Sequence, residues 1–288
     1  MESIYRSATG EELIRRWCLD QLAAWPVAHE RRTVTARGVP THVVLAGSGA
    51  TTVVFVPGTN FNAAASLPLA TALVAAGHRV LLLDVPGQPG LSSGDRGLSG
   101  GRLSWYGAWL SEVIEKVSPE PVTVLGHSFG AAIALSGDSP RVDRLVLVSP
   151  AGLARLRLTP AVLAASAAWF LRPAPKHSAR LLRTMLAPGR TPRAELVDWM
   201  TLVARHTRSS GAPGAATPPA RPIPRLVVTG EHDVFLPPRR LGPAAGAALG
   251  AELDVVPDAG HLLVEERPEY LASLLEAPGR PTPGSPVP

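Results

Sequence analysis

Short apolar runs alternate along this chain with longer segments in which apolar residues recur at helical spacing. The runs are rich in β-branched residues and bounded by turn formers, which predicts buried strands. They lie at residues 53–56, 80–84, 122–125, 145–148, 225–229 and 252–256. The spacing between them predicts helices at residues 10–25, 63–75, 105–117, 131–135 and 265–275. Because the strands are apolar throughout, we expect an α/β fold whose mostly parallel central sheet has helices on both faces.

The alternation is interrupted once, by a segment that we interpret as a helical cap over residues 152–220. It contains an apolar helix at 162–171, a basic stretch at 176–193, a helix near 195–205 and a Pro/Gly/Ala-rich end. We expect a core domain of residues 30–151 and 221–276, into which this cap is inserted. Residues 1–29 should form a helical N-terminal arm, and the Pro-rich residues 277–288 a disordered tail.

Two short strands are expected before the first buried run, at residues 31–37 and 41–46. The sequence Gly47-Ser48-Gly49 that follows has the beginning of a dinucleotide-binding fingerprint. That fingerprint must open a helix, whereas here a strand follows, so we predict a hairpin turn instead.

Composition and charge exclude several classes of protein. The net charge is +5 and the pI about 10.1, but the arginines are scattered and no nucleic-acid motif is present, so no nucleic-acid partner is expected. Cys18 is the only cysteine, which leaves no disulfide framework and no cysteine-based metal cluster. The N-terminus lacks a signal-peptide pattern, and no apolar run is long enough to span a bilayer. We therefore expect a cytoplasmic protein without a membrane partner, and its oligomeric state is left open.

Candidate chemistry begins with Gly126-His127-Ser128-Phe129-Gly130, between a buried strand and a helix. This pattern predicts a nucleophile elbow, a tight turn that holds Ser128 in a strained conformation and lifts its hydroxyl clear of the sheet. The backbone N–H of Phe129 would then point to where negative charge develops during attack on a carbonyl group. His127 is expected to point to the other side of the turn and to serve packing.

A serine nucleophile needs a base, and the base needs an orienting acid. Among the eight histidines, His261 follows the last predicted strand, at the sheet edge where ligands of open parallel sheets bind. Asp233, after the strand at 225–229, is the candidate acid, and the order Ser, Asp, His fits an elbow scaffold. Asp84 also ends a strand and is the main competitor. Asp258 is close to His261 in sequence but is not expected to orient it.

Two further features of the site stay less defined. A second oxyanion donor is expected from the loop after residue 56, from the N–H of Thr59 or alternatively of Asn60. Glu231 and His232 beside Asp233 suggest a metal site, but no second group of ligands is evident, so neither a metal nor an organic cofactor is expected.

Taken together, these residues resemble the α/β-hydrolase superfamily, and within it small microbial serine carboxylesterases. The motifs that carry the resemblance, in the family's order, are Pro57-Gly58-Thr59, Asp84-Val85-Pro86-Gly87 with Ser92, Gly126-His127-Ser128-Phe129-Gly130, Gly230-Glu231-His232-Asp233 with Pro237, and Gly260-His261 with Pro268. The resemblance covers roughly residues 30 to 276. It implies Ser128 as nucleophile, Asp233 as acid, His261 as base, N–H donors from Thr59 and Phe129, and residues 152–220 as a lid.

The expected function is therefore hydrolysis of a small-molecule carboxylic ester through an acyl-serine intermediate. The same three residues could act on a thioester, an amide or a carbon–carbon bond. A third hypothesis is a non-catalytic small-molecule binding protein, since a fold alone does not establish catalysis.

Overall fold

The centre of the protein is an eight-stranded sheet. The computed structural model describes residues 3–95, 101–208, 214–218 and 221–276. The strand order is β1-β2-β4-β3-β5-β6-β7-β8, with β1/β2 and β2/β4 antiparallel and the other pairs parallel. The strands are β1 (His29–Ala36), β2 (Val39–Ala46), β3 (Thr52–Val56), β4 (Arg79–Leu83), β5 (Val122–His127), β6 (Val142–Val148), β7 (Arg225–Gly230) and β8 (Leu253–Val256). The predicted fold class, an α/β fold around a mostly parallel sheet, is confirmed.

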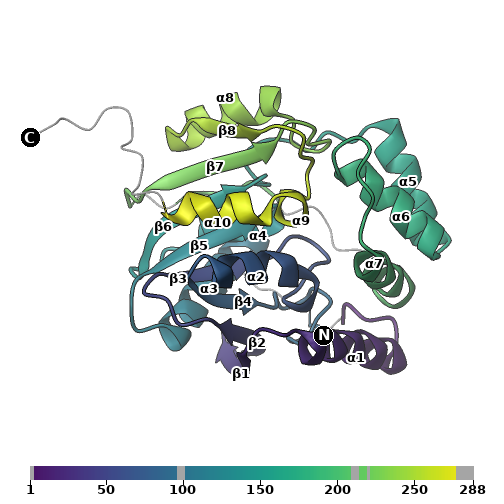
Figure 1. Ribbon diagram of the computed structural model, residues 1–288, viewed down its shortest axis with the longest axis horizontal. Coiled ribbons are helices and arrows are strands. Elements are labelled where there is room, and N and C mark those ends of the chain that lie inside the picture. The colour runs from purple at the N-terminus through teal and green to yellow at the C-terminus, as the bar shows by residue number, and fades with distance from the viewer. Residues whose placement is uncertain (1–2, 96–100, 209–213, 219–220, 277–288) are drawn as a thin grey trace, which may run out of the picture.

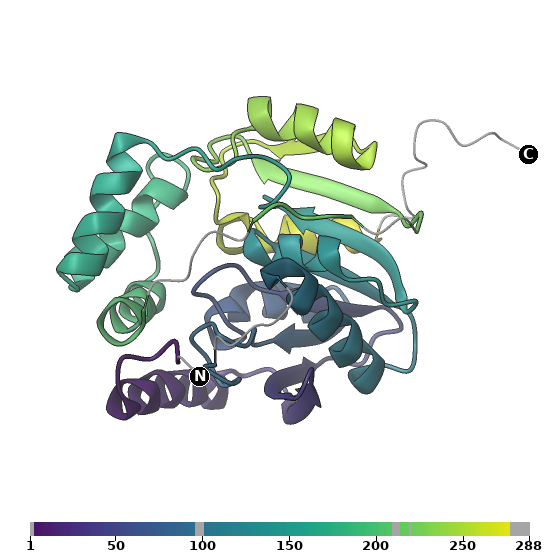
Figure 2. The same ribbon diagram turned by 180° about the vertical axis from the view of Figure 1, so that it is seen from behind.

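Helices cover both faces of this sheet (Figures 1 and 2). One face packs against α2 (Leu67–Ala75) and α10 (Pro268–Glu276), and the other against α3 (Arg102–Val117), α4 (Phe129–Ser136) and α8 (Pro238–Leu249). Side chains alternate between the two cores along each central strand. In β3, Val53 and Phe55 enter one core and Val54 and Val56 the other, so the whole strand is buried. This two-sided burial is the reason that the central runs are almost entirely apolar.

The helical segment between β6 and β7 lies beyond the carboxyl ends of the parallel strands, next to the N-terminal helix (Figure 1). It contains α5 (Pro160–Leu171), α6 (Pro175–Met185) and α7 (Ala194–His206), and α7 packs against α1 (Ala8–Ala24). The Trp17 and Trp199 rings join these two helices, with centroids 4.7 Å apart. Two short helices, η1 (Ala64–Ser66) and α9 (Leu263–Glu266), complete the described elements. The predicted tail, residues 277–288, lies outside the described residues.

The prediction of a hairpin turn at residues 47–49 is wrong. Strand β4 lies between β2 and β3, so the two strands on either side of the turn do not pair with each other. Gly47 has a φ of 72°, and a side chain there would collide with the carbonyl oxygen of His78, at the start of β4. The turn therefore crosses over the beginning of a strand that comes later in the chain, which local sequence does not reveal.

The last predicted helix is divided in two by a proline. Pro268 has no N–H to donate and disfavours helical geometry at the residue before it. Arg267 accordingly has a φ of −141°, and α9 ends there before α10 begins. Among the described residues, no helix combines the length and the apolar character needed to cross a membrane.

Candidate active site

Ser128 occupies a strained turn between β5 and α4. Its φ is 52° and its ψ is −110°, a conformation that an L-residue rarely adopts. Glycine is required on both sides of it: a Cβ at Gly130 would collide with the carbonyl oxygen of Val56, and a Cβ at Gly126 with the backbone of Ala131. The helix and strand thus approach so closely that the serine side chain projects from the turn, as expected for a nucleophile elbow.

The structure brings Ser128, His261 and Asp233 together from the carboxyl ends of β5, β8 and β7. The Nε2 atom of His261 lies 3.1 Å from the Oγ atom of Ser128, and its Nδ1 atom lies 2.9 Å from the Oδ2 atom of Asp233. The Asp233 and His261 side chains are buried, and Ser128 is half-buried. A hydroxyl, an imidazole and a carboxylate in this order can move a proton from the hydroxyl to the imidazole.

Asp233 is held as a carboxylate by the groups around it. Burial by itself would raise the pKa of its carboxyl group, but the His261 imidazole and several hydrogen bonds hold that pKa well below its ordinary value. Its Oδ1 atom accepts from the N–H groups of Phe235 at 2.9 Å and Leu236 at 2.8 Å, and its Oδ2 atom from the Thr229 hydroxyl at 3.2 Å. The same donors fix the direction of the carboxylate toward the imidazole.

His127 forms a hydrogen bond with the backbone of His261. Its Nε2 atom lies 2.9 Å from the carbonyl oxygen of His261, so the neutral ring donates Nε2–H to that oxygen. Burial, together with the neighbouring His261 imidazole, lowers the pKa of His127 to about 3. The expectation of packing alone therefore understated this side chain, which ties the elbow to the loop that carries the candidate base.

The buried His127 predicts a stability that falls in acid. The folded protein keeps the ring neutral down to about pH 3, whereas the unfolded chain takes up a proton below about pH 6.5. The unfolded state therefore binds more protons between these values, and the free energy of unfolding falls as the pH falls, by up to about 1.4 kcal/mol per pH unit from this group. In the His127→Gln variant this part of the pH dependence should disappear. Urea unfolding of both proteins at several pH values in that window measures it, and parallel curves would contradict it.

The loop after β3 lies against the elbow. A Cβ at Gly58 would lie 3.4 Å from the Cβ of Ser128. Next to it, Asn60 has a φ of 66°, and both of its backbone polar groups are bonded: its N–H donates to the Oε1 atom of Gln88 at 3.0 Å, and its carbonyl oxygen accepts from the Trp199 indole at 2.8 Å. Two distant side chains thus fix the unusual conformation of this peptide.

The backbone N–H groups of Thr59 and Phe129 have no hydrogen-bond acceptor within the described part of the chain. Phe129 is the first residue of α4, where an N–H has no partner inside the helix. Both groups are therefore available to a ligand, whereas the N–H of Asn60 is engaged by Gln88.

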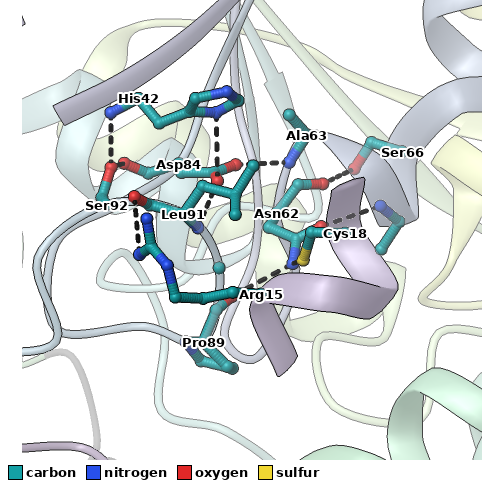
Figure 3. Close-up of polar contacts among 12 residues, drawn as sticks. Arg15, Cys18, His42, Asn62, Ala63, Ser66, Asp84, Pro89, Leu91 and Ser92 are labelled. Atoms are coloured by element: carbon teal, nitrogen blue, oxygen red, sulfur yellow. Dashed lines mark hydrogen bonds and ion pairs between the residues drawn. The ribbon is translucent and has the colours of Figure 1, made fainter. Parts of the chain in front are cut away.

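Asp84 serves a different network (Figure 3). Its Oδ1 and Oδ2 atoms accept from the backbone N–H groups of Ala63 at 2.8 Å and Leu91 at 2.7 Å. Its Oδ2 atom also lies 3.3 Å from the Nδ1 atom of His42, and its carbonyl oxygen accepts from the Ser92 hydroxyl. This buried carboxylate joins the loops after β3 and β4, and the structure pairs His261 with Asp233 instead.

Asp258 is exposed on the surface, whereas the His261 ring is buried. Together with Glu231 and His232 it forms an exposed group whose possible ligand atoms lie within 4.8 Å of one another. Sequence reasoning did not bring Asp258 to this group, because it comes from the loop after a different strand. Exposed acidic groups often gather without an ion, and we assign no role to this one.

Three site-supporting residues were not foreseen from the sequence: Gln88, Trp199 and Glu266. The carboxylate of Glu266 accepts from the backbone N–H groups of Gly260 and Ala187, each at 2.7 Å, and so joins the His261 loop to the end of α6. Gln88 is an amide side chain within an otherwise turn-forming loop, which is the one local signal that could have indicated it, and the structure buries it. The bond from Trp199 to Asn60 spans 139 positions and that from Ala187 to Glu266 spans 79, so neither can be read from the sequence.

Comparison with known proteins places these features in context. A model of the alpha/beta hydrolase family matches residues 53–274. A 2-hydroxy-6-oxononadienedioate/2-hydroxy-6-oxononatrienedioate hydrolase from Cupriavidus pinatubonensis is 37% identical over 125 residues, which span 40% of this chain and only 37% of that relative. Among solved structures, the carboxylesterase CesB of Bacillus subtilis superposes with a TM-score of 0.78 at 18% identity, covering 93% of this chain and 98% of the other. The naproxen esterase of the same species gives 0.77 at 20% identity, with coverages of 94% and 98%.

Proposed function

This chain belongs to the alpha/beta hydrolase family, and from that premise we propose that it is a serine hydrolase that cleaves a small-molecule carboxylic ester. The observation that carries the proposal is the continuous hydrogen-bonded line from the Ser128 hydroxyl through His261 to the Asp233 carboxylate. A protein that only binds its ligand has no need of all three groups in this order.

In the proposed reaction, the Oγ atom of Ser128 attacks the ester carbonyl carbon while the Nε2 atom of His261 takes the hydroxyl proton. The imidazolium then gives this proton to the leaving alcohol as the carbon–oxygen bond breaks, which leaves an acyl group on Ser128. A water molecule, deprotonated by His261, attacks the acyl carbonyl and releases the acid. Asp233 holds the imidazole in the tautomer that accepts at Nε2 and stabilises the imidazolium. This route requires neither a metal nor an organic cofactor.

We assign the oxyanion donors to the N–H groups of Phe129 and Thr59. Both are free of described acceptors, and the Thr59 loop lies against Ser128. Asn60 was the alternative, but its N–H already donates to Gln88. Each such donor typically contributes about 3 kcal/mol of transition-state stabilisation.

A fluorophosphonate probe and an ester panel test the proposed function. The probe should label Ser128 and no other serine, as located by peptide mass spectrometry. The rate of hydrolysis of p-nitrophenyl esters of increasing chain length should fall in proportion to the fraction of protein that the probe has labelled. An unlabelled protein, or one that hydrolyses esters at full rate after labelling, would contradict the proposal.

A carbon–carbon bond hydrolase is the second candidate, favoured by the match to the Cupriavidus relative. The same serine, histidine and aspartate would serve, with a 2-hydroxy-6-oxo-dienoate substrate in place of an ester. Including such a compound in the panel separates the candidates, because kcat/KM for the true substrate class should exceed the other by orders of magnitude.

The hydrogen bond from Trp199 to the Asn60 carbonyl oxygen predicts a specific loss of kcat. Trp199→Phe keeps an aromatic side chain but removes the Nε1–H that binds the Asn60 carbonyl oxygen. We expect kcat for an ester to fall about 10-fold, less than the loss of a whole oxyanion donor, because the preceding Thr59 N–H is displaced rather than removed. KM should change little, since the ground-state ester makes weak use of this donor.

Trp169→Phe is the matched control for this variant. Trp169 also donates its Nε1–H to a backbone carbonyl oxygen, that of Met200, at the same distance of 2.8 Å, but it does not touch Asn60. Equal losses of kcat in both variants would mean that the effect comes from general loosening of these helices and not from the oxyanion loop.

A further inference from the structure

Helix α5 breaks the rule that surface helices bury their apolar residues. Its sequence, PAVLAASAAWFL, has a single polar side chain, yet only Val162 and Ala165 are buried. Leu163 is 51% exposed and Leu171 is 75% exposed. The neighbouring α6 shows the usual pattern, with Leu181 and Leu182 inside. The exposure of α5 is thus particular to this helix and needs its own explanation.

The segment before the helix also exposes large apolar side chains. Leu156 is 37% exposed and Leu158 is 55% exposed. Together with Leu163 and Leu171 they account for four of the seven large apolar side chains that are exposed in the described residues. We call these four leucines the α5 leucine patch. Helix α5 packs on α6 and α7 and lies at the outer edge of the molecule (Figure 1). Nothing in the described part of the chain covers its outer side.

The chain on either side of the patch carries charge of one sign. No aspartate or glutamate occurs between Asp143 and Glu195, although cations are frequent there. Arg155 precedes α5, and Arg172 and Lys176 follow it; all three are exposed. None of these three side chains has an acidic partner among the residues that the structure describes. The patch is therefore flanked along the chain by cations on both sides, within a stretch that carries no acidic residue.

We propose that the α5 leucine patch docks onto the surface of an anionic lipid bilayer. Aliphatic side chains at the outer edge of the molecule can enter the boundary between headgroups and acyl chains, and flanking arginine and lysine attract anionic headgroups. A second copy of this chain is a poor occupant, because a symmetric contact would bring like charges together. The central contacts of protein partners favour aromatic side chains, whereas the four leucines of the patch are aliphatic, and the aromatic side chains of α5 are half-buried, with Trp169 bonded to Met200 and Phe170 in contact with Arg6. The expectation of no membrane partner rested on the absence of a spanning segment and did not consider surface docking.

Vesicle co-sedimentation of the full chain tests this proposal. The protein should pellet with vesicles of equal parts phosphatidylcholine and phosphatidylglycerol, and not with phosphatidylcholine alone. The bound fraction should fall several-fold when the salt concentration is raised from low to high, since the flanking cations are exposed and screened. Arg172→Gln/Lys176→Gln should weaken binding to the anionic vesicles in the same direction.

The decisive comparison is between two pairs of leucines. Leu163→Asp/Leu171→Asp should reduce binding to anionic vesicles about 10-fold or more, because it removes apolar contact and adds repulsion. Leu13→Asp/Leu19→Asp is the control: these leucines of α1 are 37% and 40% exposed but lie outside the patch. Both variants should retain the wild-type melting temperature and hydrolysis of a soluble short-chain ester, so a failure of the proposed reaction would leave this test intact.

Three results would overturn the proposal. The first is the absence of pelleting with either vesicle. The second is equal binding by the two leucine variants. The third is a dimer in analytical ultracentrifugation that Leu163→Asp/Leu171→Asp dissociates, which would assign the patch to a second copy of the chain.

Discussion

Replacing Ser128 by alanine should lower kcat/KM for the preferred p-nitrophenyl ester by about 10,000-fold or more. The reason is that, within the described ranges of the chain, no other hydroxyl bonds to the His261 imidazole, so the covalent route is lost and only binding and oxyanion stabilisation remain. Fluorophosphonate labelling should disappear in the same variant. The fold should persist, since alanine fits the elbow and the Ser128 hydroxyl bonds to no other described group.

Ser136→Ala is the matched control for this experiment. Ser136 ends α4, the helix that Ser128 precedes, and its hydroxyl bonds only to the carbonyl oxygen of Ala132. Its loss should leave kcat/KM within a few-fold of the wild type. If Ser128→Ala retained substantial ester hydrolysis at an unchanged melting temperature, the nucleophile would have to be another residue.

The sequence-based prediction of this fold succeeded where local pattern carries the information. Strands buried on both faces are almost entirely apolar, and helices covering them show apolar residues at helical spacing, so both classes of element were recognised. Ser128, Asp233 and His261 were placed by the same logic: each follows a parallel strand, and the carboxyl ends of parallel strands meet at one edge. These three side chains meet in the structure because the order and direction of the strands bring them to one edge of the sheet, and not because of their own residue types.

The remaining features depend on contacts between distant parts of the chain. The turn at Gly47 was misread because β4, which lies between β2 and β3, appears later in the sequence. The bond from Trp199 to Asn60 spans 139 positions and that from His127 to His261 spans 134. No periodicity or motif encodes such pairs, because each depends on how the loops pack once the sheet has formed.

The acid is a part of the proposed site for which the sequence offered competing candidates, and it gives the second large effect. Asp233→Asn should lower kcat for an ester by about 10,000-fold. The amide would preserve most of the shape of the site, but its NH₂ group cannot accept from the Nδ1–H of His261, so the imidazole would be held in the wrong tautomer to accept the serine proton. The variant should keep KM near the wild-type value and should still fold.

Asp84→Asn separates this role from that of a buried structural carboxylate. Both oxygens of Asp84 accept backbone N–H groups, so an amide NH₂ would face one of these donors, and the free energy of unfolding should fall by about 1–3 kcal/mol. Because Asp84 does not touch the His261 ring, kcat should stay within a few-fold of the wild type. Asp84→Asn should therefore lose stability and keep kcat, whereas Asp233→Asn should lose kcat and keep its fold. Chemical denaturation and steady-state kinetics of the two variants measure this difference. A large loss of kcat in Asp84→Asn with little loss in Asp233→Asn would transfer the acid role to the competitor and refute the assignment drawn from the geometry.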